Sequence, residues 1–161
     1  MSGAENFRND VLDAADLQKL SGLEAMQSIA DGHLPPAPIA EAMNFTLVSV
    51  TRGSARFEGA PLAQMRNPMG TTHGGWYGAI LDSAMAVAVQ SCLDAGTIST
   101  TLEYKVNILR PIPVGMQVCA EGEVRHAGRS TAVADARLTG IEDGRLYATA
   151  STTCIILSPK G

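Results

Sequence analysis

The chain has 161 residues, of which 45% are hydrophobic, and its formal net charge is −4. This length and composition predict one compact domain with a substantial hydrophobic core. The acidic balance argues against a nucleic-acid-binding protein, which normally presents a basic surface. The three cysteines are widely spaced and form no paired motif. We therefore expect buried free thiols in a reducing compartment, and no metal site. The polar N-terminus lacks the basic and apolar regions of a signal peptide, which favours a cytoplasmic protein.

The first part of the chain has a helical pattern. Apolar residues recur every three to five positions over residues 9–31, which predicts one or two amphipathic helices, with Ser21 as the candidate cap of the second. Residues 32–38 contain one glycine and three prolines and are expected to form a turn or linker. We expect two parts, a helical extension over residues 1–36 and the main domain over residues 37–161.

The pattern changes from helix to strand after Asn44. Two short strands with a turn at residues 52–54 precede a loop over residues 61–72 and a long apolar helix. Gly96 is a suitable residue to follow the helix C-terminus. The expected elements are strands near 45–50 and 55–59, a helix over 74–93, and strands over 98–109, 116–124, 131–138 and 146–157. The order β-β-α-β-β-β-β predicts an α+β fold in which an antiparallel sheet packs on one long helix.

The long apolar helix contains one carboxylate, Asp82. Its neighbours in the sequence are apolar or small, and no basic residue in the helix could pair with it. An unpaired buried carboxylate costs several kcal/mol, so a local function is expected to compensate. Residues 76–93 approach the length of a membrane span, but Asp82 and Gln90 interrupt them and no basic cluster flanks them. A core helix is therefore expected, and no membrane partner.

The segment before this helix is rich in turn-forming residues. It reads Asn-Pro-Met-Gly-Thr-Thr-His-Gly-Gly over residues 67–75. A glycine-rich turn that leads into a helix exposes backbone N–H groups, which bind anions and carbonyl oxygens. A carboxylate together with such N–H groups is the minimum requirement for acyl-transfer chemistry.

The loop and the element order together resemble those of hotdog-fold acyl-CoA thioesterases. The resemblance is to the PaaI-like (phenylacetate-degradation) branch, which includes 4-hydroxybenzoyl-CoA thioesterases with the carboxylate on the central helix. It covers residues 37–158 and rests on the spacing of Asn67, six residues before His73, and Asp82, nine residues after it. The resemblance implies hydrolysis of an acyl-CoA, with an aromatic or medium-chain acyl group, and no cofactor besides the CoA of the substrate.

The resemblance also implies roles for individual residues. Asp82 would be the nucleophile or general base, and the Gly74 N–H would polarise the thioester carbonyl. His73 and Asn67 would orient the carbonyl or the attacking water, and the Thr101 hydroxyl would position water. The shorter Asp, where some relatives carry Glu, leaves room for a water and favours general-base hydrolysis. The alternatives are purely structural roles: Asp82 is a structural cap, Asn67 only shapes its loop and Thr101 only forms a strand.

Further residues are candidates for binding the substrate. Gly75 lets a substrate approach the helix start closely, and Trp76 is a candidate for contact with the acyl group. The phosphates of CoA require basic or hydroxyl side chains at the mouth of the site. Candidates for this role are Arg110 and the turn residues Arg129, Ser130 and Thr131. The alternative is that the two arginines are solvated surface residues without a binding role.

Helical geometry bears on the oligomeric state. Nine residues of helix rise about 13.5 Å and complete about 2.5 turns, so Asp82 lies on the opposite face from His73. We therefore expect Asp82 to serve the helix start of an antiparallel partner, in a homodimer or in a homotetramer of two dimers.

Two other functions share this fold: an acyl-thioester dehydratase, whose His–acid spacing is absent here, and a non-catalytic acyl-CoA-binding protein or sensor, which usually carries a DNA-binding segment.

Overall fold

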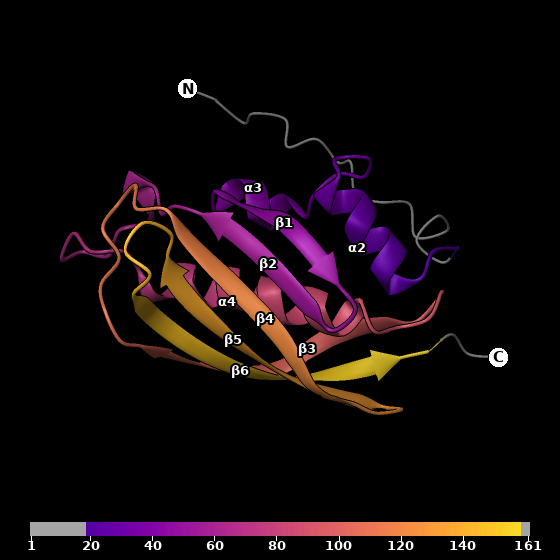
Figure 1. Cartoon of the computed structure of the whole chain (residues 1–161). Helices are drawn as coiled ribbons and strands as arrows, with labels where there is room; N and C mark the ends of the chain where they lie inside the picture. The colour runs from indigo at the N-terminus through magenta and orange to yellow at the C-terminus, as the bar shows by residue number, and fades with distance from the viewer. Residues whose placement is uncertain (1–18, 159–161) are drawn as a thin grey trace, which may run out of the picture.

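The computed structural model describes residues 19–158, which form a curved antiparallel sheet around one long helix (Figure 1). The sheet has six strands in the order β1-β2-β4-β5-β6-β3, and neighbouring strands are antiparallel throughout. The strands are β1 (Phe45–Thr51), β2 (Ser54–Gly59), β3 (Ile98–Ile108), β4 (Val118–Ala127), β5 (Thr131–Gly140) and β6 (Leu146–Leu157). The predicted element order and fold class are confirmed.

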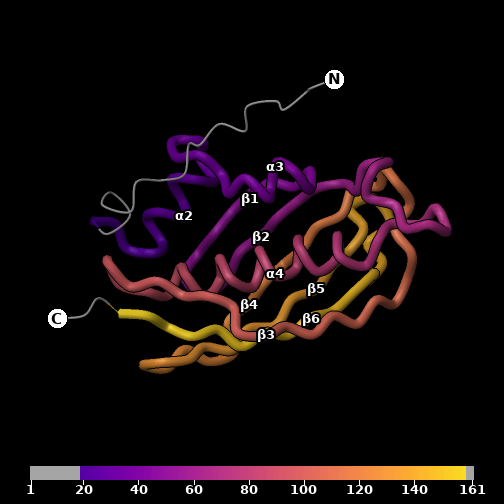
Figure 2. Tube along the Cα trace, turned by 180° about the vertical axis from the view of Figure 1, so that it is seen from behind, coloured from indigo at the N-terminus to yellow at the C-terminus, as the bar shows by residue number. Residues whose placement is uncertain are grey.

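The helix α4 (Gly74–Gln90) lies inside the curve of the sheet, where its turns can be followed in Figure 2. It is apolar on nearly every face because all six strands pack against it. The closest approach is to β4, at Gly122. A Cβ atom at Gly122 would overlap the carbonyl oxygen of Ala84 and lie 2.8 Å from the backbone nitrogen of Met85. This glycine therefore lets strand and helix backbones touch.

The helix ends three residues before the predicted position. Gln90 is its last residue and the buried Ser91 is its C-cap. The Ser91 hydroxyl accepts a hydrogen bond from the N–H of Gly53 (2.8 Å), in the β1–β2 turn. This tertiary contact decides where the helix stops, a contact that local sequence does not reveal. Gly96 has a left-handed φ of 78°, but in the next turn rather than directly after the helix.

The described part of the N-terminal extension packs onto the sheet and the end of α4. Helix α2 (Gly22–Ala30) begins at Ser21, whose predicted capping role is confirmed by a reciprocal capping box with Glu24. The Gly22 N–H donates to the carbonyl oxygen of Leu93 (2.9 Å), just beyond α4. The part of the predicted helical region before residue 19 lies outside the described residues, and the division of the chain at residue 36 stays a prediction.

Two short helical segments were not expected. Helix α3 (Pro38–Ala42) starts at a proline, which suits the first position of a helix, so the linker predicted over 32–38 is one residue shorter. The 3₁₀ helix η1 (Ala63–Met65) lies in the predicted loop.

Candidate active site

The start of α4 is arranged by His73, the N-cap residue. The Nδ1 atom of its ring accepts a hydrogen bond from the Gly75 N–H at 2.9 Å. Because Nδ1 is the acceptor, the neutral ring carries its proton on Nε2, which is left as a donor. The Gly74 N–H makes no hydrogen bond to any residue in 19–158. A Cβ atom at Gly74 would meet only the Cδ1 atom of Ile108, at 3.4 Å. One backbone donor is therefore open to a ligand at the positive end of the helix dipole.

The loop before the helix is held together by Asn67. Its Oδ1 atom accepts from the N–H groups of Met69 (3.0 Å) and Thr71 (3.2 Å), and its Nδ2 atom donates to the Thr71 hydroxyl (2.8 Å). These bonds close a tight turn around Gly70, whose φ is 83°. In the single chain Asn67 therefore shapes the loop that presents the helix start, and the second N–H of its Nδ2 atom has no partner among the described residues.

Asp82 lies two turns further along α4 and faces the edge strand β3. Its Oδ1 atom accepts a hydrogen bond from the Thr101 hydroxyl at 2.8 Å, and the carboxylate is half-buried. Burial raises the pKa of Asp82 above its usual value, whereas the hydrogen bond from Thr101 favours the ionised form and opposes that rise. A carboxylate with a raised pKa, held by one hydroxyl and partly open to solvent, suits a general base or nucleophile.

The strand β3 is fastened to α4 near this pair of residues. The side chain of Gln90 accepts from the backbone N–H (3.0 Å) and the hydroxyl (3.1 Å) of Ser99, and donates to the carbonyl oxygen of Thr97 (3.0 Å). Ser99 lies two residues before Thr101, so the clamp fixes the strand that carries the hydroxyl. Sequence reasoning missed this role of Gln90, since only the fold brings the end of the helix to the start of β3.

The candidates for substrate binding are distributed differently. Trp76 is only 2% exposed, and its Nε1 atom donates to the carbonyl oxygen of Met43 at 2.7 Å. The neighbouring Tyr77 is equally buried, and its hydroxyl accepts from the Ile112 N–H at 2.7 Å. In the single chain, both aromatic residues fix the first turn of α4 in the core and present no surface to a substrate. Gly75, in contrast, is exposed at the helix start.

The arginine candidates lie at opposite ends of the molecule. Arg110 follows the end of β3, beside the start of α4, and donates to the carbonyl oxygen of Leu146 at 2.5 Å. Arg129, Ser130 and Thr131 lie at the turn between β4 and β5, beside the start of β3 and the end of β6. The two ends of the sheet are well separated in Figure 2. One chain therefore does not bring these four residues together in one cluster. Arg145, which was not a candidate, lies near Arg110, because it directly precedes Leu146, whose carbonyl oxygen accepts from Arg110.

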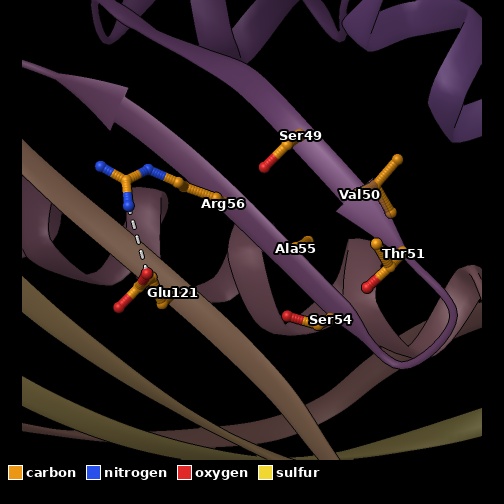
Figure 3. A pocket seen from close by; sticks show the side chains of 7 residues that line it. All are labelled: Ser49, Val50, Thr51, Ser54, Ala55, Arg56 and Glu121. Carbon is orange, nitrogen blue, oxygen red and sulfur yellow. Dashed lines mark hydrogen bonds and ion pairs between the residues drawn. The ribbon is translucent and has the colours of Figure 1, made fainter.

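A separate shallow cavity of about 210 Å³ lies between β1 and β2 (Figure 3). It is lined by residues 49–51, residues 54–56 and Glu121. Its two charged groups already pair with each other, because Arg56 contacts Glu121 at 3.3 Å. Arg56 also contacts Glu58, outside the lining, at 2.8 Å. None of the candidate catalytic residues lines it, so it is not part of the site on α4.

The described residues contain no group of side chains that could hold a metal ion, and no helix among them is long and apolar enough to cross a membrane. The cysteines in this part of the chain are free thiols; Cys119 and Cys154 are buried, and Cys92 is half-buried. Cys154 pairs with Thr101 across the β3–β6 ladder.

A six-stranded antiparallel sheet curved around one central helix is the hotdog fold, here with a carboxylate on the helix and an open N–H group at its start. Comparison with known proteins agrees. Residues 69–147 match the family model described as the thioesterase superfamily. The acyl-coenzyme A thioesterase PaaI of Escherichia coli K12 is 31% identical over 96 residues, which are 60% of this chain and 66% of that protein. The chain thus matches about two thirds of the length of this curated relative.

Solved structures show the same relationship. The Escherichia coli PaaI structure superimposes with a TM-score of 0.75 over 87% of this chain and 99% of that chain, and its 24% identity shows a shared fold. A conserved protein from Pseudomonas aeruginosa is 30% identical, with a TM-score of 0.70 over 76% of this chain and 95% of that chain. The family model, the named relative and the shared fold together support a PaaI-like hotdog thioesterase.

Proposed function

We propose that this protein hydrolyses acyl-CoA thioesters to a free acid and CoA, with Asp82 as base or nucleophile and the Gly74 N–H as oxyanion donor. The observation that carries the proposal is the half-buried Asp82 carboxylate on α4, which accepts a hydrogen bond from Thr101 of β3. The same helix begins with an unpaired N–H group at Gly74. The named relative, an acyl-coenzyme A thioesterase, supports the choice of substrate class. The acyl group is aromatic or of medium length.

The chemistry requires charge stabilisation at the carbonyl oxygen and attack at the carbonyl carbon. The thioester oxygen accepts a hydrogen bond from the Gly74 N–H, and the bond strengthens as negative charge develops. In the general-base route, Asp82 takes a proton from water, the hydroxide adds to the carbon, and the C–S bond breaks to release the CoA thiolate, which takes up the proton. In the nucleophilic route, the Asp82 carboxylate adds to the carbonyl carbon, releases the thiolate and forms an anhydride, which water then cleaves.

Two features of the chain support a dimeric site. Gly74 and Asp82 are eight residues apart, about 12 Å along the helix, which is too far for both to reach one carbonyl. The strand β3 is also an unpaired sheet edge with exposed apolar side chains. The exposed apolar residues of β3 are Ile98, Leu102, Tyr104 and Ile108. We infer that the edges of two chains meet with α4 antiparallel, so that Asp82 of each faces Gly74 of the other. Two such dimers would form a tetramer.

The same arrangement accounts for the two separated groups of CoA-binding candidates. Antiparallel helices bring the C-terminal end of one α4 beside the N-terminal end of the other. The turn with Arg129, Ser130 and Thr131 of one copy then lies on the side of Arg110 of the second copy. A CoA that enters at this mouth would meet arginines from both copies.

The test is thiol release from a panel of acyl-CoAs by the wild type and Asp82→Asn. The matched control is Asp94→Asn, the same substitution at an exposed position after α4. We expect the wild type to hydrolyse some members, Asp82→Asn to lose at least about 100-fold, and Asp94→Asn to retain the activity. A protein-only blank is needed because Cys92 is half-buried. Binding of acyl-CoA without thiol release by the wild type would reject hydrolysis and favour the dehydratase or the binding protein.

A further inference from the structure

Tyr104 lies on the stripe of α4 that joins the two catalytic groups. Gly74, Gly78 and Asp82 follow each other at intervals of four residues, so they share one side of the helix. A Cβ atom at Gly78 would lie 3.0 Å from the Tyr104 hydroxyl and 3.3 Å from the Cε2 atom of its ring. The phenol therefore rests directly on the helix backbone, one turn from each catalytic group.

A bulge in β3 turns this side chain toward the helix. Thr101 pairs with Cys154 and Glu103 with Thr153, so Leu102 is an extra residue in the strand. Before the bulge, the odd-numbered Ser99 and Thr101 contact α4. After it, the even-numbered Tyr104 and Ile108 do. Without the extra residue, Tyr104 would share a face with Leu102 and point away from the site.

The Tyr104 ring is partly exposed in the single chain, and its hydroxyl lacks a hydrogen-bond partner among the described residues. Tyr104 is 46% exposed, and its hydroxyl makes no hydrogen bond to any residue in the described part of the chain. A large aromatic side chain packed on a glycine, with one open face, is the kind of surface that receives an apolar ligand group.

We propose that Tyr104 sets the size of the acyl group that the enzyme accepts. The proposal rests on the thioesterase function proposed above. A carbonyl bound at Gly74 has its CoA arm toward the mouth near Arg110, so the acyl group extends the other way, along the stripe toward Gly78. Gly78 is about 6 Å along the axis from Gly74, which is close to the length of one aromatic ring. The Tyr104 ring closes the stripe at that point. Acyl groups with a single ring fit before it, and long chains do not.

The symmetry of the inferred dimer strengthens the argument. If Asp82 of each chain faces Gly74 of the other, the helices cross at the midpoint of these positions, which is Gly78. The two copies of Tyr104 then lie near the two-fold axis and form a wall between the two sites. An acyl group therefore meets this wall from either side.

The experiment compares kcat/KM across acetyl-, butyryl-, phenylacetyl-, octanoyl- and dodecanoyl-CoA. Tyr104→Ala is expected to raise the ratio of dodecanoyl to phenylacetyl turnover at least about tenfold, since single pocket contacts change selectivity by this amount. Tyr104→Phe should keep the wild-type ratio because the ring remains. Lys105→Ala is the matched control, since the next residue of the strand faces the other side of the sheet. Tyr104→Leu shortens the wall while it keeps an apolar contact with Gly78. This variant replaces Tyr104→Ala in the comparison if the alanine variant does not fold.

An unchanged ratio in the alanine and leucine variants, or an equal fall for all five substrates, would overturn the proposal. A wild type that hydrolyses none of the five would reject the thioesterase function separately. In that case, binding of non-hydrolysable dodecyl- and phenylethyl-CoA thioethers tests Tyr104 alone. A preference for the smaller group that is lost in Tyr104→Leu supports the role, and a preference that persists rejects it.

Discussion

The Gly74 N–H can be removed without changing the helix that carries it, by replacing Gly74 with proline. Gly74 is the first residue of α4, where the N–H has no partner in the helix and proline is favoured. The preceding residue must be extended, and His73 has φ −66° and ψ 139°, as a residue before proline requires. A Cβ atom at this position meets only the Cδ1 atom of Ile108, at 3.4 Å. Proline therefore fits the backbone and deletes one donor.

The expected cost is catalytic. Loss of one oxyanion donor raises the barrier by about 2.7–4 kcal/mol, which is about a 10²–10³-fold fall in kcat. Stability should be unchanged or rise by about 0.4–1 kcal/mol, because proline restricts the unfolded chain. Gly74→Ala is the matched variant, since it adds the same Cβ atom and keeps the N–H.

The assay is thiol release from the best acyl-CoA of the panel, with thermal unfolding followed by circular dichroism. The reasoning predicts a folded, nearly inactive proline variant beside an alanine variant that retains most of its activity. If the folded proline variant is as active as the alanine variant, the Gly74 N–H does not bind the carbonyl oxygen, and another donor must be sought at the loop.

Three further outcomes follow from the site and its packing. In Thr101→Val, loss of the hydrogen bond that lowers the pKa of Asp82 should move the acid limb of the kcat/KM–pH profile to higher pH. An acid limb at the same pH would show that Thr101 does not affect the ionisation of the catalytic base. Burial raises the pKa of Asp82, so the folded state binds the proton more tightly than the unfolded state, and stability falls as pH rises through the range between the two pKa values. Asp82→Asn should therefore unfold at a higher temperature than the wild type at neutral pH and lose this advantage below about pH 4, in a thermal scan at both pH values. Gly122→Ala should destabilise the fold by about 1–3 kcal/mol in urea unfolding, since its Cβ atom would overlap the Ala84 carbonyl; wild-type stability would show that the strand can move away.

Local sequence was sufficient for the order of the elements. Alternation of apolar residues marks the strands, and a long apolar run marks the buried helix, because these periodicities follow from backbone geometry alone. The cap at Ser21 and the start of α4 were predictable for the same reason, since a capping residue bonds to N–H groups two or three positions away. The isolated carboxylate at Asp82 was visible because its sequence neighbours are apolar.

The partners of these residues were decided only by the tertiary structure. Trp76 follows the loop over residues 67–73 in the sequence, yet the turn of the helix directs its indole into the core. Arg110 and Arg129 both follow strands, yet the pairing of β3, β5 and β6 places them at opposite ends of the sheet. Periodicity shows which face of an element is apolar, but not its register against a neighbour. One extra residue, Leu102, sets the register that brings both Thr101 and Tyr104 onto α4, and sequence-distant strands determine where that residue is accommodated.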